Sequence, residues 1–116
     1  MSKTIFCDID GTLVYQVPFE EINLTTSMAL PGVVKKMNEW YNSGYYIVLT
    51  TARPEEYELI TKQEMMNLDI PYHQLVMGIG RSERVLINNK SVKNPTEKRA
   101  TAIEVEKNGG FNDIDI

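Results

Sequence analysis

Two short apolar runs constrain the fold of this chain more than any other feature of its sequence. Residues 4–7 and 45–50 consist almost entirely of β-branched, aromatic and aliphatic side chains, with no alternation of polar and apolar positions. Strands of this kind are buried on both faces, as in parallel sheets that helices cover. A third, shorter run spans residues 74–77. We therefore predict an α/β fold in which right-handed helical crossovers join parallel strands.

The segments between these runs have helical periodicity. The first helix is expected to start at Pro31, which suits a first helical turn, and to stop at Gly44. The second is expected to start at Pro54, where two acids follow near the positive end of the helix dipole, and to end near Asn67. Apolar residues mark the expected buried sides: Val33, Val34, Met37, Trp40 and Tyr41 in the first helix, and Leu59, Ile60 and Met66 in the second.

Further strands are expected at residues 84–87 and 100–105. They would complete a mainly parallel, five-stranded sheet in a three-layer, Rossmann-like architecture. The length of 116 residues fits a single domain over residues 1–116, without repeats or an internal linker. Residues 13–30 lack clear periodicity and are expected to form a loop or flap, and residues 112–116 a flexible tail.

Charge and composition argue against several classes of partner. The formal net charge is −4, whereas nucleic-acid-binding domains favour basic patches. No stretch approaches the roughly 18 apolar residues of a membrane span, and no signal peptide is visible before Asp8. We expect a cytoplasmic protein that binds neither nucleic acid nor membrane. The single cysteine, Cys7, falls in the first apolar run and is expected to be a small buried side chain.

Polar clusters follow three of the expected strands. They are Asp8 with Asp10, Thr51 with Arg53, and Asn88 with Asn89. In an open parallel sheet, the ligand lies beyond the carboxyl ends of the strands. These clusters therefore predict a site at one edge of the sheet.

The two acids at this edge are the residues with the clearest chemistry. Asp8 and Asp10 are one residue apart, so an extended chain would place them on the same side, where they repel unless a cation or proton lies between them. Mg²⁺ prefers such oxygen ligands together with water and phosphate. An aspartate can also act as a nucleophile, and a second acid can transfer protons. On spacing alone, a strand-to-turn junction capped by Asp side chains is the alternative.

These residues resemble the haloacid dehalogenase (HAD) superfamily of phosphatases. Residues 8–13 (Asp-Ile-Asp-Gly-Thr-Leu), after an apolar strand, look like its first signature, and residues 47–54 (Ile-Val-Leu-Thr-Thr-Ala-Arg-Pro) resemble its second. The likeness in order and spacing covers residues 3 to about 90. Neither residues 13–30 nor the stretch between Pro54 and Gln74 has room for an inserted cap domain, so the resemblance is to the capless branch.

The resemblance implies a Mg²⁺-dependent phosphomonoester hydrolase that works through an aspartyl-phosphate intermediate. Asp8 would be the nucleophile and Asp10 the general acid/base, with the main-chain carbonyl of Asp10 on the metal. Thr51 would hydrogen-bond the phosphoryl group. For the third signature, a cation that neutralises the phosphoryl charge, Arg81 is the first candidate and Lys62 and Lys90 are alternatives. Substrate contacts are implied for Gly11, Thr12, Ala52, Arg53 and Lys90.

The chain departs from the HAD pattern at the fourth signature. Acids usually follow the fourth strand there, whereas this chain has Asn88 and Asn89, and no acid lies between Glu83 and Glu97. The Asn88 carbonyl can bind Mg²⁺ but brings no charge. A second hypothesis is therefore a catalytically impaired HAD-fold protein that binds a phosphorylated ligand or a protein partner. A receiver domain of the response-regulator type is a weaker alternative, because no Asp ends a later strand.

Capless relatives include sugar-phosphate phosphatases of surface-polysaccharide synthesis, and they are often oligomeric. The resemblance therefore implies a small phosphorylated substrate, with a sugar phosphate as the most specific expectation. It also allows a homo-oligomer, in which a neighbouring subunit would enclose the open site.

Overall fold

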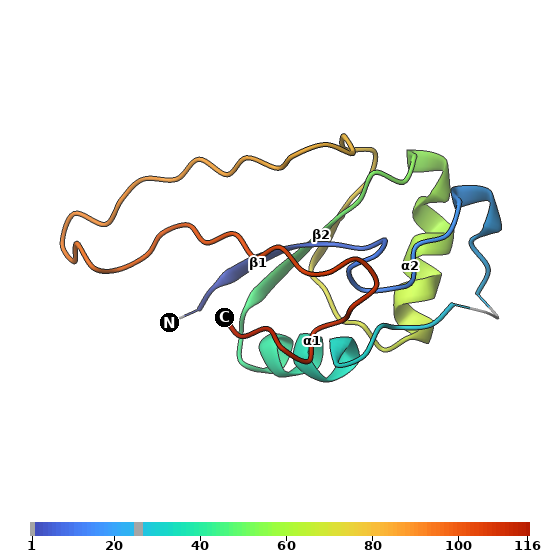
Figure 1. Cartoon of the computed structure of the whole chain (residues 1–116), viewed down its shortest axis with the longest axis horizontal. Coiled ribbons are helices and arrows are strands. Elements are labelled where there is room, and N and C mark those ends of the chain that lie inside the picture. The colour runs from blue at the N-terminus through green and yellow to red at the C-terminus, as the bar shows by residue number, and fades with distance from the viewer. Residues whose placement is uncertain (1, 25–26) are drawn as a thin grey trace.

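A parallel sheet forms the centre of the computed structural model, which describes residues 2–24 and 27–116. Its strands are β1 (Thr4–Asp8), β2 (Tyr46–Thr50) and β3 (Gln74–Val76). They lie in the order β1-β2-β3 and all run in the same direction (Figure 1). The register aligns Asp8 with Thr50 and Thr50 with Val76, so the carboxyl ends of all three strands meet at one edge.

Two α-helices make the crossovers between the strands. They are α1 (Val33–Asn42), between β1 and β2, and α2 (Glu58–Asn67), between β2 and β3. Helix α1 follows most of the expected pattern, because Val33, Met37 and Trp40 are buried on one side, whereas Tyr41 is 40% exposed. At its end, the Ser43 hydroxyl donates a hydrogen bond of 2.8 Å to the carbonyl of Glu39. Short 3₁₀-helices η1 (Phe19–Glu21) and η2 (Glu55–Tyr57) lie before α1 and α2.

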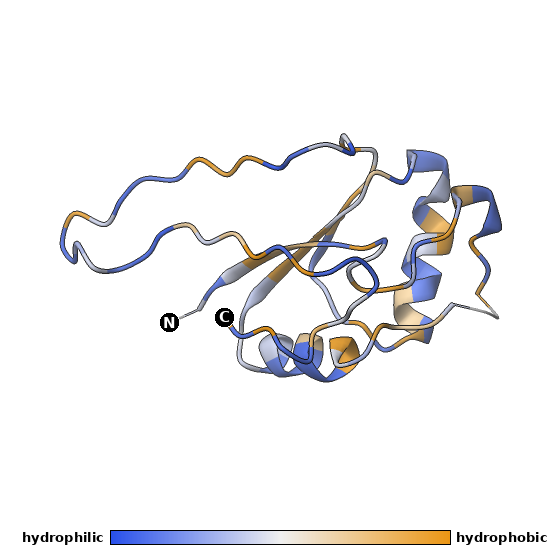
Figure 2. Ribbon diagram, viewed as in Figure 1, coloured by the Kyte–Doolittle hydropathy of each residue, from blue (hydrophilic) through white to orange (hydrophobic). Residues whose placement is uncertain are grey.

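The hydrophobic core lies between the sheet and these two helices. Strands and helices contribute to one cluster of buried side chains that includes Cys7, Ile47, Leu49, Met37 and Met65. Figure 2 shows hydrophobic residues along the central strands and, separately, along the two legs of the long loop after β3. No helix in residues 2–24 or 27–116 is both long and apolar enough to cross a membrane.

The buried side of α2 differs from the sequence prediction. Leu59 and Met66, expected to face the core, are 69% and 76% exposed, whereas Thr61 and Glu64 are buried together with Met65. The reason is that α2 turns its polar residues inward to meet a buried arginine, as described below. Leu59 and Met66 therefore lie on the outer side of α2.

The second half of the predicted sheet is absent from this structure. Residues 77–116, all of which are described, contain neither strand nor helix, so the prediction of five strands and of a second helical layer is wrong for this structure. Residues 81–105 instead form two extended legs joined at a tip, which we call the arm (Figure 1). Between the legs, the described contacts include one hydrogen bond, from Asn88 Nδ2 to the Arg99 carbonyl at 2.7 Å. Without a ladder of backbone hydrogen bonds, the legs are not strands.

The loop over residues 13–30 and the C-terminal segment are packed more closely than the sequence indicated. In the loop over residues 13–30, Leu13, Val14 and Leu30 are buried; residues 25–26 of this loop lie outside the described part of the chain. The segment 112–116, expected to be a flexible tail, packs Ile114 and Ile116 against the core. Phe111 lies just before it and is buried, and its ring is tilted against that of Trp40 at a centroid distance of 5.8 Å.

Candidate active site

A tight turn after β1 positions the two acids that the sequence singled out. The chain reverses at Gly11, whose φ is 78°, and backbone N–H groups of the turn donate to Ile9 and Val14 carbonyls at 2.8–3.2 Å. The side chain of Ile9 is fully buried, which fixes the turn in the core. Asp8 and Asp10, on either side of Ile9, therefore project from the core toward the carboxyl edge of the sheet.

Asp8 lies at the end of β1 and is half-buried. Its Oδ2 accepts a hydrogen bond of 3.0 Å from the Thr12 hydroxyl. Burial raises the pKa of Asp8 above its ordinary value, hydrogen bonds from Thr12 and the Ile9 backbone oppose this, and the charge of Asp10 adds to it. The charge of Arg84, at the base of the arm, lowers the same pKa. The second carboxylate oxygen, Oδ1, accepts no hydrogen bond from a described side chain.

Asp10 is held by a buried guanidinium. Nε of Arg53 lies 3.2 and 3.0 Å from the two carboxylate oxygens of Asp10, and Nη2 donates to Oδ1 at 2.8 Å. Thr51 adds a longer contact of 3.4 Å from its hydroxyl to Oδ2. The Asp10 side chain is 11% exposed and that of Arg53 is 1% exposed. Both carboxylate oxygens of Asp10 are therefore occupied by a fork-shaped pair of charged hydrogen bonds.

The other side of Arg53 faces α2. Nη1 donates to the Thr61 hydroxyl at 3.0 Å and forms an ion pair of 2.8 Å with Oε1 of Glu64. The hydroxyl of Ser27, in the loop over residues 13–30, donates to Oε2 of Glu64. Burial opposes the charged form of Arg53, but the hydrogen bonds and charges of Asp10 and Glu64 outweigh it and raise the pKa of Arg53. Arg53 thus links the β1 turn, the end of β2 and α2.

The end of β2 supplies the second half of the site. The Thr51 hydroxyl accepts a hydrogen bond of 3.1 Å from the Arg53 backbone N–H and reaches Asp10 with its own proton. Thr51 is fully buried, and Ala52 beside it is partly exposed. The structure therefore brings together six of the predicted site residues: Asp8, Asp10, Gly11, Thr12, Thr51 and Arg53.

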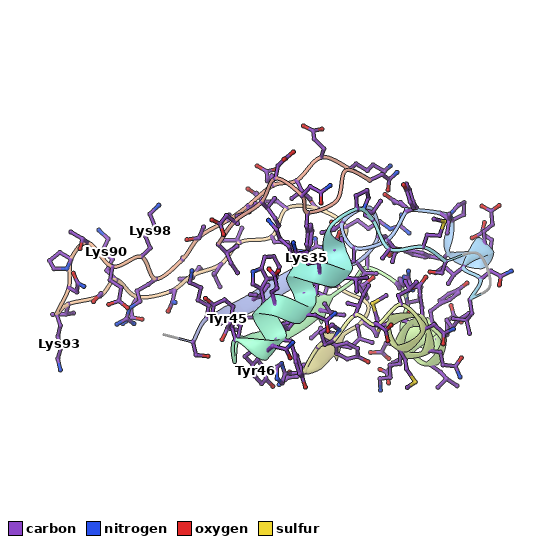
Figure 3. The ribbon with its side chains drawn as sticks, turned by 90° about the horizontal axis from the view of Figure 1, so that it is seen from below. Lys35, Tyr45, Tyr46, Lys90, Lys93 and Lys98 are labelled. Atoms are coloured by element: carbon purple, nitrogen blue, oxygen red, sulfur yellow. The ribbon has the colours of Figure 1, made fainter. Side chains whose placement is uncertain are left out.

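The three predicted cations lie elsewhere. Arg81 places its guanidinium 4.6 Å from the centre of the Phe19 ring, and Lys62 pairs with Glu58 at 3.0 Å on the exposed side of α2. Lys90 lies near the tip of the arm, far from the sheet (Figure 3). The structure does not bring any of them to Asp8. The cation whose charge reaches Asp8 is Arg84, which the sequence reasoning passed over because it treated residues 84–87 as a buried strand.

Oxygen atoms at this corner fit part of a Mg²⁺ site. They are the Asp8 carboxylate and the main-chain carbonyl of Asp10, which accepts no hydrogen bond from a described residue. Asn88, the expected third ligand, lies on the arm, and within the described residues no three His, Cys, Asp or Glu side chains gather around one point. Mg²⁺ commonly keeps several waters and takes phosphate oxygens as ligands. One carboxylate and one carbonyl therefore suit a metal that arrives with a phosphate.

A turn at Asn108 and Gly109, as the Asn-Gly-Gly sequence predicts, covers the Gly11 turn from outside, and this packing has no signature in either local sequence. The N–H of Asn108 donates to the Gly11 carbonyl at 2.8 Å, and its side-chain oxygen accepts from the Gln16 N–H at 3.0 Å. The stem of Lys107 lies 3.3 Å from the position that a Cβ on Gly11 would take. Asn108 itself has a φ of 61°, which Asn tolerates better than most residues.

A cavity of about 230 Å³ lies between the loop over residues 13–30 and α2, with Arg53 and Glu64 on its wall. A wider hollow of about 700 Å³ lies beside η1 and is lined by residues 20–24 and Ile60. Asp8 lines neither of these two spaces and is half-buried at the carboxyl edge of the sheet.

Cys7 precedes Asp8 and points to the other side of the sheet, into the core. Burial, with a smaller effect from the charge of Asp8, raises the pKa of its thiol to about 12. A thiol in this state is a packing residue, as the sequence predicted, and not a nucleophile.

Comparisons with known proteins support the class of fold. The sequence matches no protein-family model, and no curated protein is significantly similar to it. A solved structure of a structural genomics target from Vibrio cholerae is similar, with a TM-score of 0.55 and 17% sequence identity over 80% of this chain and 84% of that chain. At this identity the likeness shows the fold alone. The chain is an α/β protein built on a parallel sheet.

Proposed function

We propose that this protein is a phosphomonoester hydrolase of the HAD type, in which Asp8 attacks the phosphorus of a small phosphorylated substrate. The observation that carries the proposal is the position of Asp8 at the carboxyl edge of the sheet. A half-buried carboxylate, Asp8, lies beside the Gly11–Thr12 turn and the Thr51 side of β2. Burial raises the pKa of Asp8 despite the charge of Arg84, so a further positive group such as a metal ion would stabilise its carboxylate.

The proposed reaction has two steps. In the first, an Asp8 oxygen forms a bond to phosphorus while the ester P–O bond breaks, and the leaving oxygen takes up a proton. In the second, water attacks the phosphorus of the aspartyl-phosphate, which releases inorganic phosphate and restores the Asp8 carboxylate. Mg²⁺ bound by Asp8 and the Asp10 carbonyl would supply charge neutralisation for the phosphoryl oxygens.

The Arg53 clamp limits what Asp10 can do in this reaction. Both oxygens of the Asp10 carboxylate are hydrogen-bonded to the Arg53 guanidinium, which holds this side chain in place and away from a leaving group. Asp10 would act only after its contact with Arg53 loosens; otherwise its role is to position Arg53 and Thr51. A substrate whose leaving group needs little protonation should therefore react faster than an alkyl phosphate.

The test is turnover of a panel of phosphate esters, including aryl and sugar phosphates, with Mg²⁺ and after its removal by a chelator. Asp8→Asn should reduce turnover to background, because the amide is not a nucleophile. Asp113→Asn, an exposed acid in the C-terminal segment, is the matched control and should retain full turnover. Turnover that persists in Asp8→Asn would refute the mechanism.

A second candidate function is a HAD-fold protein that binds a phosphorylated ligand without hydrolysing it. The observation in its favour is that Asn88 and Lys90, two of the predicted site residues, lie on the arm and not beside Asp8. This candidate predicts no turnover by the unaltered chain, together with calorimetrically detectable binding of inorganic phosphate that Arg84→Met weakens. Robust hydrolysis by the unaltered chain would exclude it.

A further inference from the structure

The arm carries apolar side chains that nothing in this structure covers. Val85, Ile87 and Val92 are 73%, 91% and 91% exposed. Because of the arm, the molecule measures 49 × 27 × 24 Å, and its radius of gyration is 14.8 Å, against about 13.4 Å for a compact chain of this length. Exposed apolar groups on an extended segment mark an interaction surface.

The charge of the arm is opposite to that of the rest of the chain. Residues 81–105 contain six Lys or Arg and three Asp or Glu, a net charge of +3. The remaining residues contain six Lys or Arg and thirteen Asp or Glu, a net charge of −7. Lys90, Lys93 and Lys98 project from the outer part of the arm in Figure 3, and none forms an ion pair with a described residue. The arm is thus a basic, apolar surface attached to an acidic body.

The opposite end of the molecule offers a matching surface. The hollow of about 700 Å³ beside η1 has Glu20 and Glu21 on its wall, together with apolar Ile22, Leu24 and Ile60. Both glutamates are exposed, and neither forms an ion pair within the described part of the chain. The rings of Phe19 and Tyr57, 6.0 Å apart, join η1 to η2, which adds exposed Glu55 and Glu56 at the same end.

The tip of the arm lies far from this hollow in its own chain, although Arg81 at the base of the arm contacts Phe19 of η1. Figure 1 shows the arm running along the long axis from the side of α2, with its tip at the end opposite to η1 and α2. In two antiparallel copies side by side, however, each tip lies at the hollow of the other copy. A two-fold arrangement of this kind satisfies both contacts and leaves no tip free to recruit a third chain.

We propose that the basic arm tip of one copy, with Lys90, Val92 and Lys93, docks in the acidic hollow beside η1 of a second copy, which gives a closed two-fold dimer. Val92 contacts the apolar floor at Ile22 and Ile60, and the lysines face Glu20 and Glu21. This inference does not depend on the phosphatase proposal, since it uses neither Asp8 nor its neighbours.

The experiment is measurement of molar mass by light scattering and of the dimer dissociation constant by sedimentation, over a range of protein and salt concentrations. The unaltered full chain should be a dimer that dissociates as salt rises, because the contact joins unlike charges. Lys93→Glu and Glu21→Lys should each raise the dissociation constant by at least about tenfold, since each puts like charges together. The double variant with both changes should restore dimerisation.

Two controls separate the docking from general effects of charge and hydrophobicity. Lys35→Glu, an exposed lysine on α1 (Figure 3), changes the net charge equally and should leave the dissociation constant unchanged. Val92→Asp should also weaken the dimer, whereas Leu59→Asp, at a 69% exposed site on α2, should not. Both Val92 and Leu59 are exposed within the chain, so circular dichroism should show the fold intact in each variant.

Four outcomes would overturn the proposal. They are a monomer at every concentration, a dimer that neither Lys93→Glu nor Glu21→Lys weakens, no recovery in the charge-swapped double variant, and assemblies that grow without limit as concentration rises. A monomer that binds a single-stranded oligonucleotide through Lys90 and Lys93 would assign the arm to nucleic acid instead. None of these results bears on whether Asp8→Asn abolishes turnover.

Discussion

The turn after β1 and the arm after β3 both follow a strand of the same sheet, yet they differ in almost every physical respect. In the turn, Ile9 and Leu13 are fully buried and the backbone bonds to itself at Ile9 and Val14. In the arm, Val85 to Ile87 are at least 55% exposed, and the legs share little hydrogen bonding. Both segments combine apolar and charged residues. The difference is whether another part of the chain covers them.

The largest expected contrast concerns the arginines of the two regions. Arg53→Met leaves Asp10 and Glu64 without their buried cation, which should lower the free energy of unfolding by about 3–5 kcal/mol. Arg99→Met on the arm removes an exposed ion pair with Glu97, 3.5 Å long, and should cost about 0–1 kcal/mol. Urea denaturation of both variants measures the two values. Equal losses would show that the clamp is not buried in solution.

A smaller contrast concerns two glycines. Gly11 has a φ of 78°, and a Cβ there would lie 3.3 Å from the Lys107 stem. Gly11→Ala should therefore lower the free energy of unfolding by about 1–2 kcal/mol. Gly80, directly before the arm, has a negative φ and open space around it, so Gly80→Ala should change stability by no more than about 0.5 kcal/mol. Thermal unfolding of the pair gives the comparison, and a neutral Gly11→Ala would contradict the turn geometry.

The smallest expected effect is a pH dependence of the free energy of unfolding that arises from the titration of Asp8. The pKa of Asp8 in the folded chain is above its ordinary value of 3.8, so between these two values the folded chain binds more protons than the unfolded one. The free energy of unfolding should then fall as pH rises through the window above 3.8. Asp8→Asn should remove this fall, which makes the variant more stable than the unaltered chain at neutral pH.

A second variant, Thr12→Val, tests the same effect of the Asp8 pKa on stability by extending the pH dependence where Asp8→Asn removes it. Thr12→Val removes a hydrogen bond that lowers the pKa of Asp8, so the fall in stability should continue to higher pH than in the unaltered chain. Denaturation curves between acid and neutral pH measure both variants. A pH dependence that is identical in all three chains would show that Asp8 titrates normally.

Local patterns predicted the three strands and the buried stripe of the first helix well. The apolar runs at 4–7, 45–50 and 74–77 are the three parallel strands, and the Val33, Met37 and Trp40 stripe of α1 is buried as expected. The convergence of Asp8, Asp10, Thr51 and Arg53 also followed from strand direction alone. These inferences succeed because they depend on the hydrophobic pattern of short segments. They also use the rule that the carboxyl ends of parallel strands meet at one edge of the sheet.

Contacts between segments that lie far apart in the sequence could not be predicted from local patterns. The buried side of α2 could not be recognised, because Thr61 and Glu64 resemble surface residues until Arg53 is known to lie beneath them. The run at residues 84–87 has the composition of a strand, but a strand also needs a neighbour, and the sequence does not specify one. For the same reason the prediction placed Asn88 and Lys90 at the site, whereas the structure has them on the arm.

Cys7 has a practical consequence for following motion at the site. Its thiol is buried one residue before Asp8, and its pKa of about 12 leaves almost no thiolate at neutral pH. An alkylating reagent can therefore modify this chain only when β1 separates from the core. Since the chain has a single cysteine, the rate of its modification reports directly how often the strand that carries Asp8 opens.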